Sequence, residues 1–243
     1  MISPDDFSLQ VRAVLEPLAD RKHAAWMTAY MRGQFPFLGI PKPLRGKATG
    51  ALVAACKNLP AADLFKIAEA LWQLKEREYL YTATELLDRH SGVLRLEDLE
   101  RIFKFALQKS WWDSVDTLAS TINTILFRER KDPASQAMMD VLLDHPDFWL
   151  RRIAMIHQLG WREETDQKRL FHYARRLGGT HEFFLQKAAG WALRDYARHN
   201  PDAVVKFVAQ HRNSLSALTA REAVKCCLPR KSGKKSKIPE AGS

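Results

Sequence analysis

Two tryptophans and two carboxylates lie within six residues of this 243-residue chain, at the end of the segment Lys109–Asp116. We predict a helix over 111–130, on which Trp112 and Asp116 share one side at the border of the buried face, because they are four residues apart. A half-buried carboxylate must find hydrogen-bond donors or a cation, so this segment can hold a reactive acid beside an aromatic ring. In the alternative interpretation Asp113, and less readily Asp116, only favour the start of the helix through its dipole.

A second candidate group lies on a helix that we predict over 181–198. Trp191 points away from the stripe of aliphatic residues, on a stripe that it shares with Lys187, Arg194 and Arg198. An exposed tryptophan among bases suggests nucleic acid, because phosphates bind the bases and the indole ring can stack. A tryptophan packed against a neighbouring repeat, with solvated bases around it, is the alternative.

The composition is that of a globular protein with an excess of base. The chain has 38 Lys and Arg against 28 Asp and Glu, a net charge of +10, and 46 % hydrophobic residues, which excludes a disordered or collagen-like chain. Such a charge favours nucleic acid, or less often an anionic membrane, as the partner. Residues 229–243 carry five of the bases and one acid, and we expect a flexible basic tail there; the rest keeps a net charge of +6.

Several other classes of protein are disfavoured. Cys56, Cys226 and Cys227 form no CxxC pair, so we expect buried thiols in a reducing compartment. The sequence has neither a signal peptide nor an apolar run of about 18 residues, so we expect no membrane span and a cytoplasmic location. The eight histidines include no HxxxH pair, and we therefore expect no metal site.

Apolar residues recur at spacings of three and four rather than two, which predicts an all-α fold. The segment 35–43 contains three prolines and is predicted to be a rigid apolar loop. We predict about thirteen helices: one that begins after Ser3, and others at 21–34, 44–57, 61–74, 76–90, 96–108, 111–130, 133–144, 147–159, 163–177, 181–198, 201–212 and 216–227.

The helices form pairs that repeat along the chain. Leu150–Ala154 aligns with Leu185–Ala189 at a shift of 35, and the segment 112–116 lies about 36 residues upstream of the first. This period, with two helices per unit, is typical of an α-solenoid of HEAT or armadillo type with one concave surface; an irregular helical bundle is the alternative. Arg152, one period after Asp116, is expected to lie beside that carboxylate, to face the groove, or to form a plain salt bridge.

Five blocks of the sequence resemble the AlkD-type DNA alkylation repair glycosylases, a family of HEAT-like repeats. The resemblance spans about residues 5–227, and its most specific blocks are KSWWDSVD and QKxxGWxLR. The tail has no counterpart in it. The five blocks are Tyr30–Ile40, Leu71-Trp72 with Glu76–Glu78, Lys109–Asp116, Trp149–Arg152, and Phe184–Trp191 with Arg194.

The resemblance implies a single HEAT-like domain over residues 1–228 that binds alkylated double-stranded DNA on a concave basic face. It also implies a monofunctional glycosylase that removes cationic N3- and N7-alkylated purines, without base flipping. We expect a nucleoid-associated protein that needs no cofactor, and a monomer by default. The residues that match the family's catalytic positions are Trp112, Asp116 and Trp191, and those that match its DNA contacts are Tyr30 and Arg152. We expect Lys187, Arg194 and Arg198 to add DNA contacts. A non-catalytic protein that binds DNA structures, and a protein-binding scaffold, are the alternatives.

Overall fold

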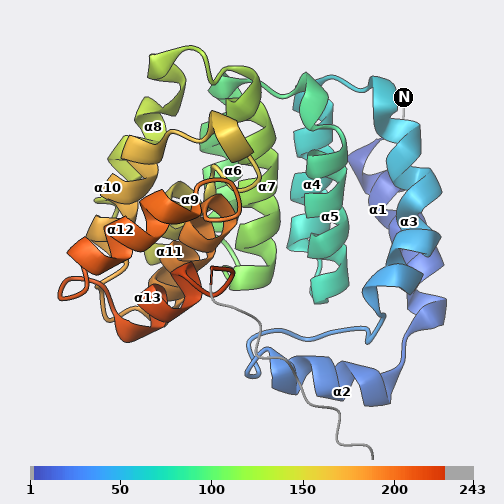
Figure 1. Ribbon diagram of the computed structural model, residues 1–243. Helices are drawn as coiled ribbons and strands as arrows, with labels where there is room; N and C mark the ends of the chain where they lie inside the picture. Colours follow the sequence, from blue (N-terminus) through green and yellow to red (C-terminus); the bar gives the residue numbers. More distant parts are fainter. Residues whose placement is uncertain (1–2, 228–243) are drawn as a thin grey trace, which may run out of the picture. The chain divides into compact units, whose positions relative to one another are not determined.

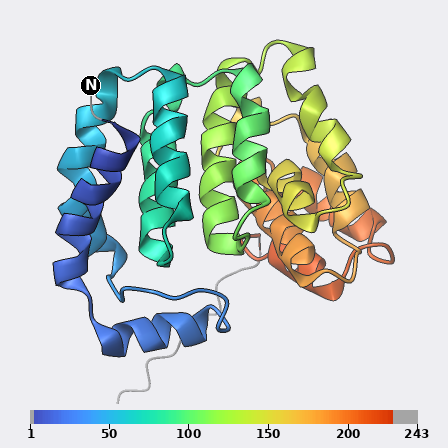
Figure 2. The same cartoon turned by 180° about the vertical axis from the view of Figure 1, so that it is seen from behind.

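The computed structural model describes residues 3–227, and over this range the chain forms thirteen α-helices and no strand (Figures 1 and 2). The prediction of an all-α fold is thereby confirmed. None of the described helices is long and apolar enough to cross a membrane. The helices are α1 (Pro4–Leu15), α2 (Arg21–Tyr30), α3 (Lys42–Ala55), α4 (Ala61–Gln73), α5 (Arg77–Arg89), α6 (Leu99–Ala106), α7 (Trp112–Arg128), α8 (Ala137–Leu142), α9 (Phe148–Ile156), α10 (Gln167–Leu177), α11 (Phe183–Tyr196), α12 (Pro201–Gln210) and α13 (Ala217–Ala223).

The chain divides into two compact units, Met1–Gln158 and Leu159–Ser243. In the first unit α1 packs on α3 and α4, α4 on α5, α5 on α7, and α7 on α6 and α9, so that helical pairs follow one another side by side as in an α-solenoid (Figure 1). In the second unit α11 packs on α10, α12 and α13. The single domain over 1–228 stays a prediction, and the predicted basic tail lies outside the described residues.

Side chains one sequence period apart lie beside each other in the first unit. Arg77 contacts Asp113, and Arg152 contacts Asp116, each pair 36 residues apart. The repeat that we detected in the sequence therefore corresponds to contacts between successive helical pairs.

Local signals explain where the helices begin and end. Ser3 caps α1 as predicted, because its Oγ accepts a hydrogen bond from the backbone N–H of Asp6 at 3.1 Å. Helix α2 ends at Tyr30, earlier than predicted, because Arg32 and Gly33 have left-handed backbone conformations with φ of 56° and 73°. Helix α8 is shorter than the predicted 133–144, because Pro133–Gln136 forms a 3₁₀ turn before it.

The predicted rigid loop between α2 and α3 is held by a buried carboxylate. Glu78 has no exposed surface and accepts hydrogen bonds from the backbone N–H groups of Leu38, Gly39 and Ile40 at 2.9, 2.8 and 3.1 Å. Gly39 has a φ of +90°, and a Cβ there would lie 2.1 Å from the carbonyl oxygen of Asp20. Only glycine therefore allows the loop to approach α2 this closely.

The expectation of buried thiols is confirmed for Cys56 and wrong for Cys226 and Cys227. Burial raises the pKa of the Cys56 thiol. The other two lie in the turn after α13, where Cys226 is exposed and Cys227 partly exposed. Their Sγ atoms are 3.9 Å apart and are not bonded.

Candidate active site

The carboxylate of Asp116 is held by a two-point salt bridge in the first unit. Asp116 lies one turn inside α7, and Arg152 lies in the middle of α9. The Nε of Arg152 donates to Oδ1 at 2.7 Å, and its Nη2 donates to Oδ2 at 2.8 Å. The side chain of Asp116 is 20 % exposed and that of Arg152 only 6 %. Arg152 therefore lies beside Asp116, and its role as a DNA contact stays a prediction.

The surroundings of Asp116 weaken its solvation without leaving it unpaired. Burial raises the pKa of Asp116 above its ordinary value, and the nearby charge of Asp113 adds to this, while the hydrogen bonds and charge of Arg152 oppose it. A carboxylate that is partly removed from water interacts more strongly with a nearby positive charge than a fully solvated one. Asp116 is therefore suited to stabilise a cation.

A row of aromatic rings runs along α2 and reaches Trp112, the first residue of α7. The ring of Trp112 meets that of Tyr30 edge-on at 6.3 Å. Tyr30 stacks on Trp26 at 5.5 Å, and Trp26 stacks on His23 at 5.5 Å. We call His23, Trp26, Tyr30 and Trp112 the aromatic row. Trp26 and Tyr30 are each 59 % exposed.

Sequence reasoning missed His23 and Trp26. Helix α2 contains no buried residue, so core packing does not explain why its aromatic side chains line up. Their spacing at 23, 26 and 30 places them on one side of a helix, and this spacing in a helix of low hydrophobicity is the signal that could have identified them.

A cavity of about 570 Å³ lies beside the aromatic row and has Trp112 and Asp116 on its wall. Four carboxylates and two basic side chains line it, and two of these carboxylates, Asp113 and Asp116, pair with arginines that are not among the lining residues. Its volume is within the range of small-molecule sites. The lining residues are Met27, Met31, Lys42, Arg45, Tyr81, Thr84, Glu85, Asp88, Trp112, Asp113, Asp116, Thr117 and Ser120.

Asp113 has a different environment from Asp116. It lies in the first turn of α7, as the helix-dipole interpretation expects, but its carboxylate is 7 % exposed and accepts two hydrogen bonds from Arg77, at 3.0 and 2.6 Å. The hydroxyl of Tyr81 donates to it at 2.5 Å. Burial, and then the charge of Asp113, raises the pKa of Tyr81. These contacts hold the start of α7, and with it Trp112, in place.

The remaining residues of the KSWWDSVD block are structural. Lys109 has a left-handed backbone with φ of 50°, and its Nζ donates to the carbonyl oxygens of Trp72 and Leu74 at 2.6 and 2.7 Å. Trp111 packs against Trp149 with their rings 5.9 Å apart. The block thus joins the end of α4 to α7 and α9.

The predicted residues of the second unit lie on and just after α11. Trp191 is 37 % exposed, as its helical stripe predicts. A Cβ on Gly190 would lie 2.6 Å from the Cβ of Glu222, which explains the glycine before this tryptophan through the close packing of α11 on α13.

The three predicted bases of this unit have acidic partners. Lys187 lies 3.4 Å from Glu222, which also pairs with Arg194. Burial raises the pKa of Glu222, but Lys187, Arg194 and Lys225 outweigh this and the net shift is downward. Arg198 lies 3.6 Å from Asp195 and keeps 63 % of its side chain exposed. Arg198 is therefore the most accessible of the three.

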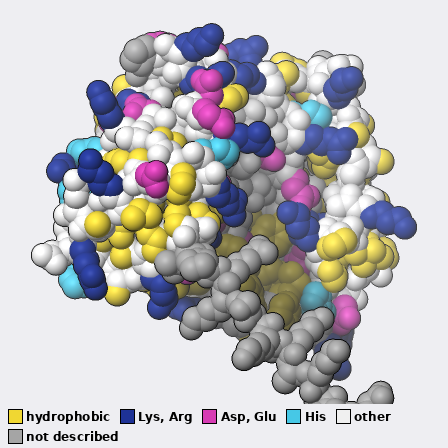
Figure 3. Space-filling model, in the orientation of Figure 1, with side chains coloured by type: hydrophobic (Ala, Val, Ile, Leu, Met, Phe, Trp, Pro, Cys, Tyr) yellow, Lys and Arg dark blue, Asp and Glu magenta, His cyan; other side chains and the backbone are white. Residues whose placement is uncertain are grey.

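The basic side chains are not gathered in one place on the face drawn in Figure 3, where Lys and Arg are spread among acidic and hydrophobic groups. The concave basic face stays a prediction. Among residues 3–227, no group of three or more His, Cys, Asp or Glu side chains is placed to hold a metal ion.

The fold and the site define a helical-repeat protein with an arginine-paired carboxylate beside exposed aromatic rings. The family model for DNA alkylation repair enzymes matches residues 11–226, and the chain belongs to this family. A solved structure described as a predicted DNA alkylation repair enzyme from Enterococcus faecalis is 33 % identical, with a TM-score of 0.80 over 85 % of this chain and 95 % of that chain. No curated protein matches. Family and fold together support a role in DNA alkylation repair.

Proposed function

We propose that the protein is a monofunctional DNA glycosylase that hydrolyses the N-glycosidic bond of cationic N3- and N7-alkylated purines in duplex DNA. The observation that carries this proposal is Asp116, a partly desolvated carboxylate that Arg152 holds on the wall of a cavity beside exposed aromatic rings. A partly buried carboxylate interacts more favourably with a positively charged lesion than with an ordinary neutral base. The reaction requires only water as a second reactant, and we propose no cofactor.

In the proposed reaction, the bond between C1′ and the purine nitrogen breaks and its electron pair leaves with the base. The alkylated base already carries a positive charge, so it leaves as a neutral molecule while positive charge develops on the deoxyribose. Asp116 stabilises this charge and orients the attacking water, whose oxygen bonds to C1′ and whose proton passes to the carboxylate or to solvent. Arg152 is a positioning residue, because it acts through Asp116.

The aromatic residues are proposed to bind the DNA. Trp112 offers a ring face to the electron-poor sugar beside Asp116, and Tyr30 and Trp26 continue this surface along α2. Trp191 and Arg198 supply contacts from the second unit, with Lys187 and Arg194 near them. Exposed rings can contact a lesion that stays in the helix, and this supports excision without base flipping.

The direct test is release of free base from a duplex that contains N7-methylguanine, measured at saturating protein against the spontaneous rate. Wild-type protein is expected to release the base, and Trp191→Ala is expected to release it more slowly while its helical content is unchanged. No release above the spontaneous rate, with DNA binding intact, would identify a non-catalytic DNA-binding protein. Binding that hardly changes with salt would instead indicate a protein scaffold, since binding to phosphates weakens steeply with salt.

Excision is expected to fall as the pH is lowered, and to do so at a higher pH than an ordinary aspartate would cause. Burial raises the pKa of Asp116 above 3.8, and the protonated acid cannot stabilise a cation, so activity is lost as the pH falls through this raised value. The measurement is base release from neutral pH downward, corrected at each pH for spontaneous release and for bound DNA. Activity that stays constant until the pH reaches 3.8 would contradict the role of Asp116.

Trp26→Ala is expected to weaken binding to duplex DNA by about tenfold, because stacking on an aromatic ring contributes about 1–3 kcal/mol. The side chain is 59 % exposed, so the thermal stability should hardly change. Leu9→Ala is the control, because Leu9 is 61 % exposed in the same unit and lies on α1. Fluorescence anisotropy with a labelled duplex measures both, and equal affinities would exclude Trp26 from the DNA surface.

A further inference from the structure

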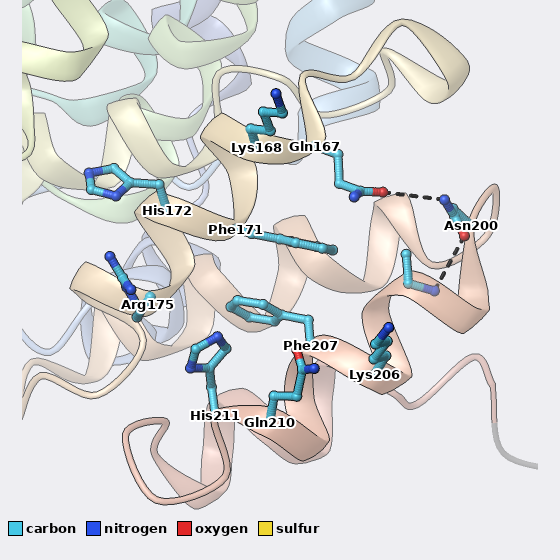
Figure 4. Close-up of a pocket in the computed structure, with 11 residues that line it drawn as sticks. Gln167, Lys168, Phe171, His172, Arg175, Asn200, Lys206, Phe207, Gln210 and His211 are labelled. Carbon is cyan, nitrogen blue, oxygen red and sulfur yellow. Dashed lines mark hydrogen bonds between the residues drawn. The ribbon is translucent and has the colours of Figure 1, made fainter.

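A second cavity, of about 670 Å³, lies within the second unit between α10 and α12 (Figure 4). One face of α10 lines it through Lys168, Phe171, His172 and Arg175, which are three or four residues apart as neighbours on a helix are. Helix α12 contributes residues at the same spacing, from Ala203 to Gln210. One face of each helix therefore lines the same cavity.

The lining changes in character along the cavity. At one end Gln167 meets Asn200, whose Nδ2 donates to the Oε1 of Gln167 at 3.3 Å. In the middle the rings of Phe171 and Phe207 stack at 4.4 Å, nearly parallel. Figure 4 shows the amides, the two phenyl rings and a basic group following one another in this order.

The basic group at the other end consists of His172, Arg175 and His211. His211 lies against Phe207 with their rings 4.7 Å apart, so the basic end adjoins the aromatic middle. Lys168 and Lys206 extend the positive charge along both helices.

No Asp or Glu lines this cavity. Within the described residues, none of Lys168, Arg175 and Lys206 forms an ion pair. On α11 of the same unit two cations are neutralised, because Glu222 pairs with Lys187 and Arg194. Lys168, Arg175 and Lys206 are exposed, so an anion can bind to them without first breaking an ion pair.

We propose that this cavity binds a phosphorylated nucleoside. The phosphate lies at the basic end on Arg175 and the two histidines, the base or sugar packs against Phe171, and the amides at the far end meet the polar edge of the base. Phe171 is partly exposed, whereas Phe207 is 5 % exposed and packs against the ring of Phe171. The ligand is a free nucleotide or the terminal nucleotide of a strand, since both carry this chemistry. The site is separate from Asp116 and does not depend on the proposed glycosylase activity.

Isothermal titration of the full chain with adenosine 5′-monophosphate tests the proposal, with adenosine and inorganic phosphate as partial ligands. Arg175→Gln is expected to weaken binding of the monophosphate by about tenfold, the effect of one charge-assisted hydrogen bond. Arg221→Gln is the matched control, because Arg221 is an exposed arginine of the same unit outside the cavity. Both variants should keep the wild-type rate of base release, which separates this proposal from the glycosylase proposal.

The expected result is that the monophosphate binds more tightly than adenosine or phosphate and that only Arg175→Gln weakens it. No binding of the monophosphate, or equal binding by the two variants, would overturn the proposal, and phosphate binding as tightly as the monophosphate would overturn the nucleoside part. Single-stranded oligonucleotides with and without a 5′-phosphate distinguish the sources. Tighter binding of the phosphorylated strand assigns the site to strand ends, and equal binding assigns it to free nucleotides.

Discussion

Asp116→Asn is expected to reduce the release of N7-methylguanine by about 10²–10³-fold, the usual effect of removing one group that stabilises transition-state charge. The amide has nearly the same shape, but it is neutral and no longer stabilises a cation. It also removes the carboxylate that accepts two hydrogen bonds from Arg152, which is 6 % exposed. Single-turnover base release at saturating protein measures the loss.

The matched control is Asp88→Asn, which removes the same charge from the wall of the same cavity. Asp88 is a hydrogen-bond acceptor of Thr121 and does not contact Arg152, so a much smaller loss is expected. DNA affinity should remain close to that of the wild type in both variants. Equal losses of activity would show that the cavity acts through its total charge, and Asp116 would then have no special role.

Arg77→Ala is expected to lower the free energy of unfolding by about 3–5 kcal/mol, the usual effect of breaking a buried ion pair from one side. The side chain of Arg77 is 1 % exposed. It donates to Asp113, to the carbonyl oxygen of Lys109 and to Ser114, and it lies over the ring of Phe35 at 3.8 Å. Without it the carboxylate of Asp113 is buried with no cation. Urea denaturation followed by circular dichroism measures the change.

Arg101→Ala is the control for this substitution. Arg101 also pairs with an acid, Glu69, and lies over an aromatic ring, that of Phe65 at 4.1 Å. Its pair is exposed, however, and the expected loss is below about 1 kcal/mol. The double variant Arg77→Met/Asp113→Leu should be more stable than Arg77→Ala, because apolar groups replace both charges. Equal losses for Arg77→Ala and Arg101→Ala would show that burial does not govern the first pair.

The two carboxylates of the KSWWDSVD block illustrate how far the sequence predicts the site. Their positions on α7 follow from the helical period, which is a local property. Their partners do not, since Arg77 and Arg152 each lie 36 residues away. The sequence period made Arg152 a candidate neighbour of Asp116, but it left open whether the arginine would pair with the acid or face the groove.

For the basic side chains of the second unit, the sequence predicted their positions on the chain but not their acidic partners. Lys187 and Arg194 lie on α11 and Arg198 in the turn after it, and each has an acidic partner. No pattern in the sequence groups Lys168, Arg175 and Lys206, because they are distributed over two helices that are about 30 residues apart in the chain. Their helices bring them together around two phenyl rings.

The sequence by itself therefore determined the helical class, the repeat, the start of α1, the rigid loop between α2 and α3, and the position of Asp116 beside Trp112 on one helix. Each depends on residues within a few turns of one another, or on a period that is visible in the chain. Only the tertiary structure decided which acid is buried against which arginine, which aromatic rings form a row, and which cations remain unpaired. Those properties depend on the distance between side chains on different helices, and burial then sets how strongly each charge acts.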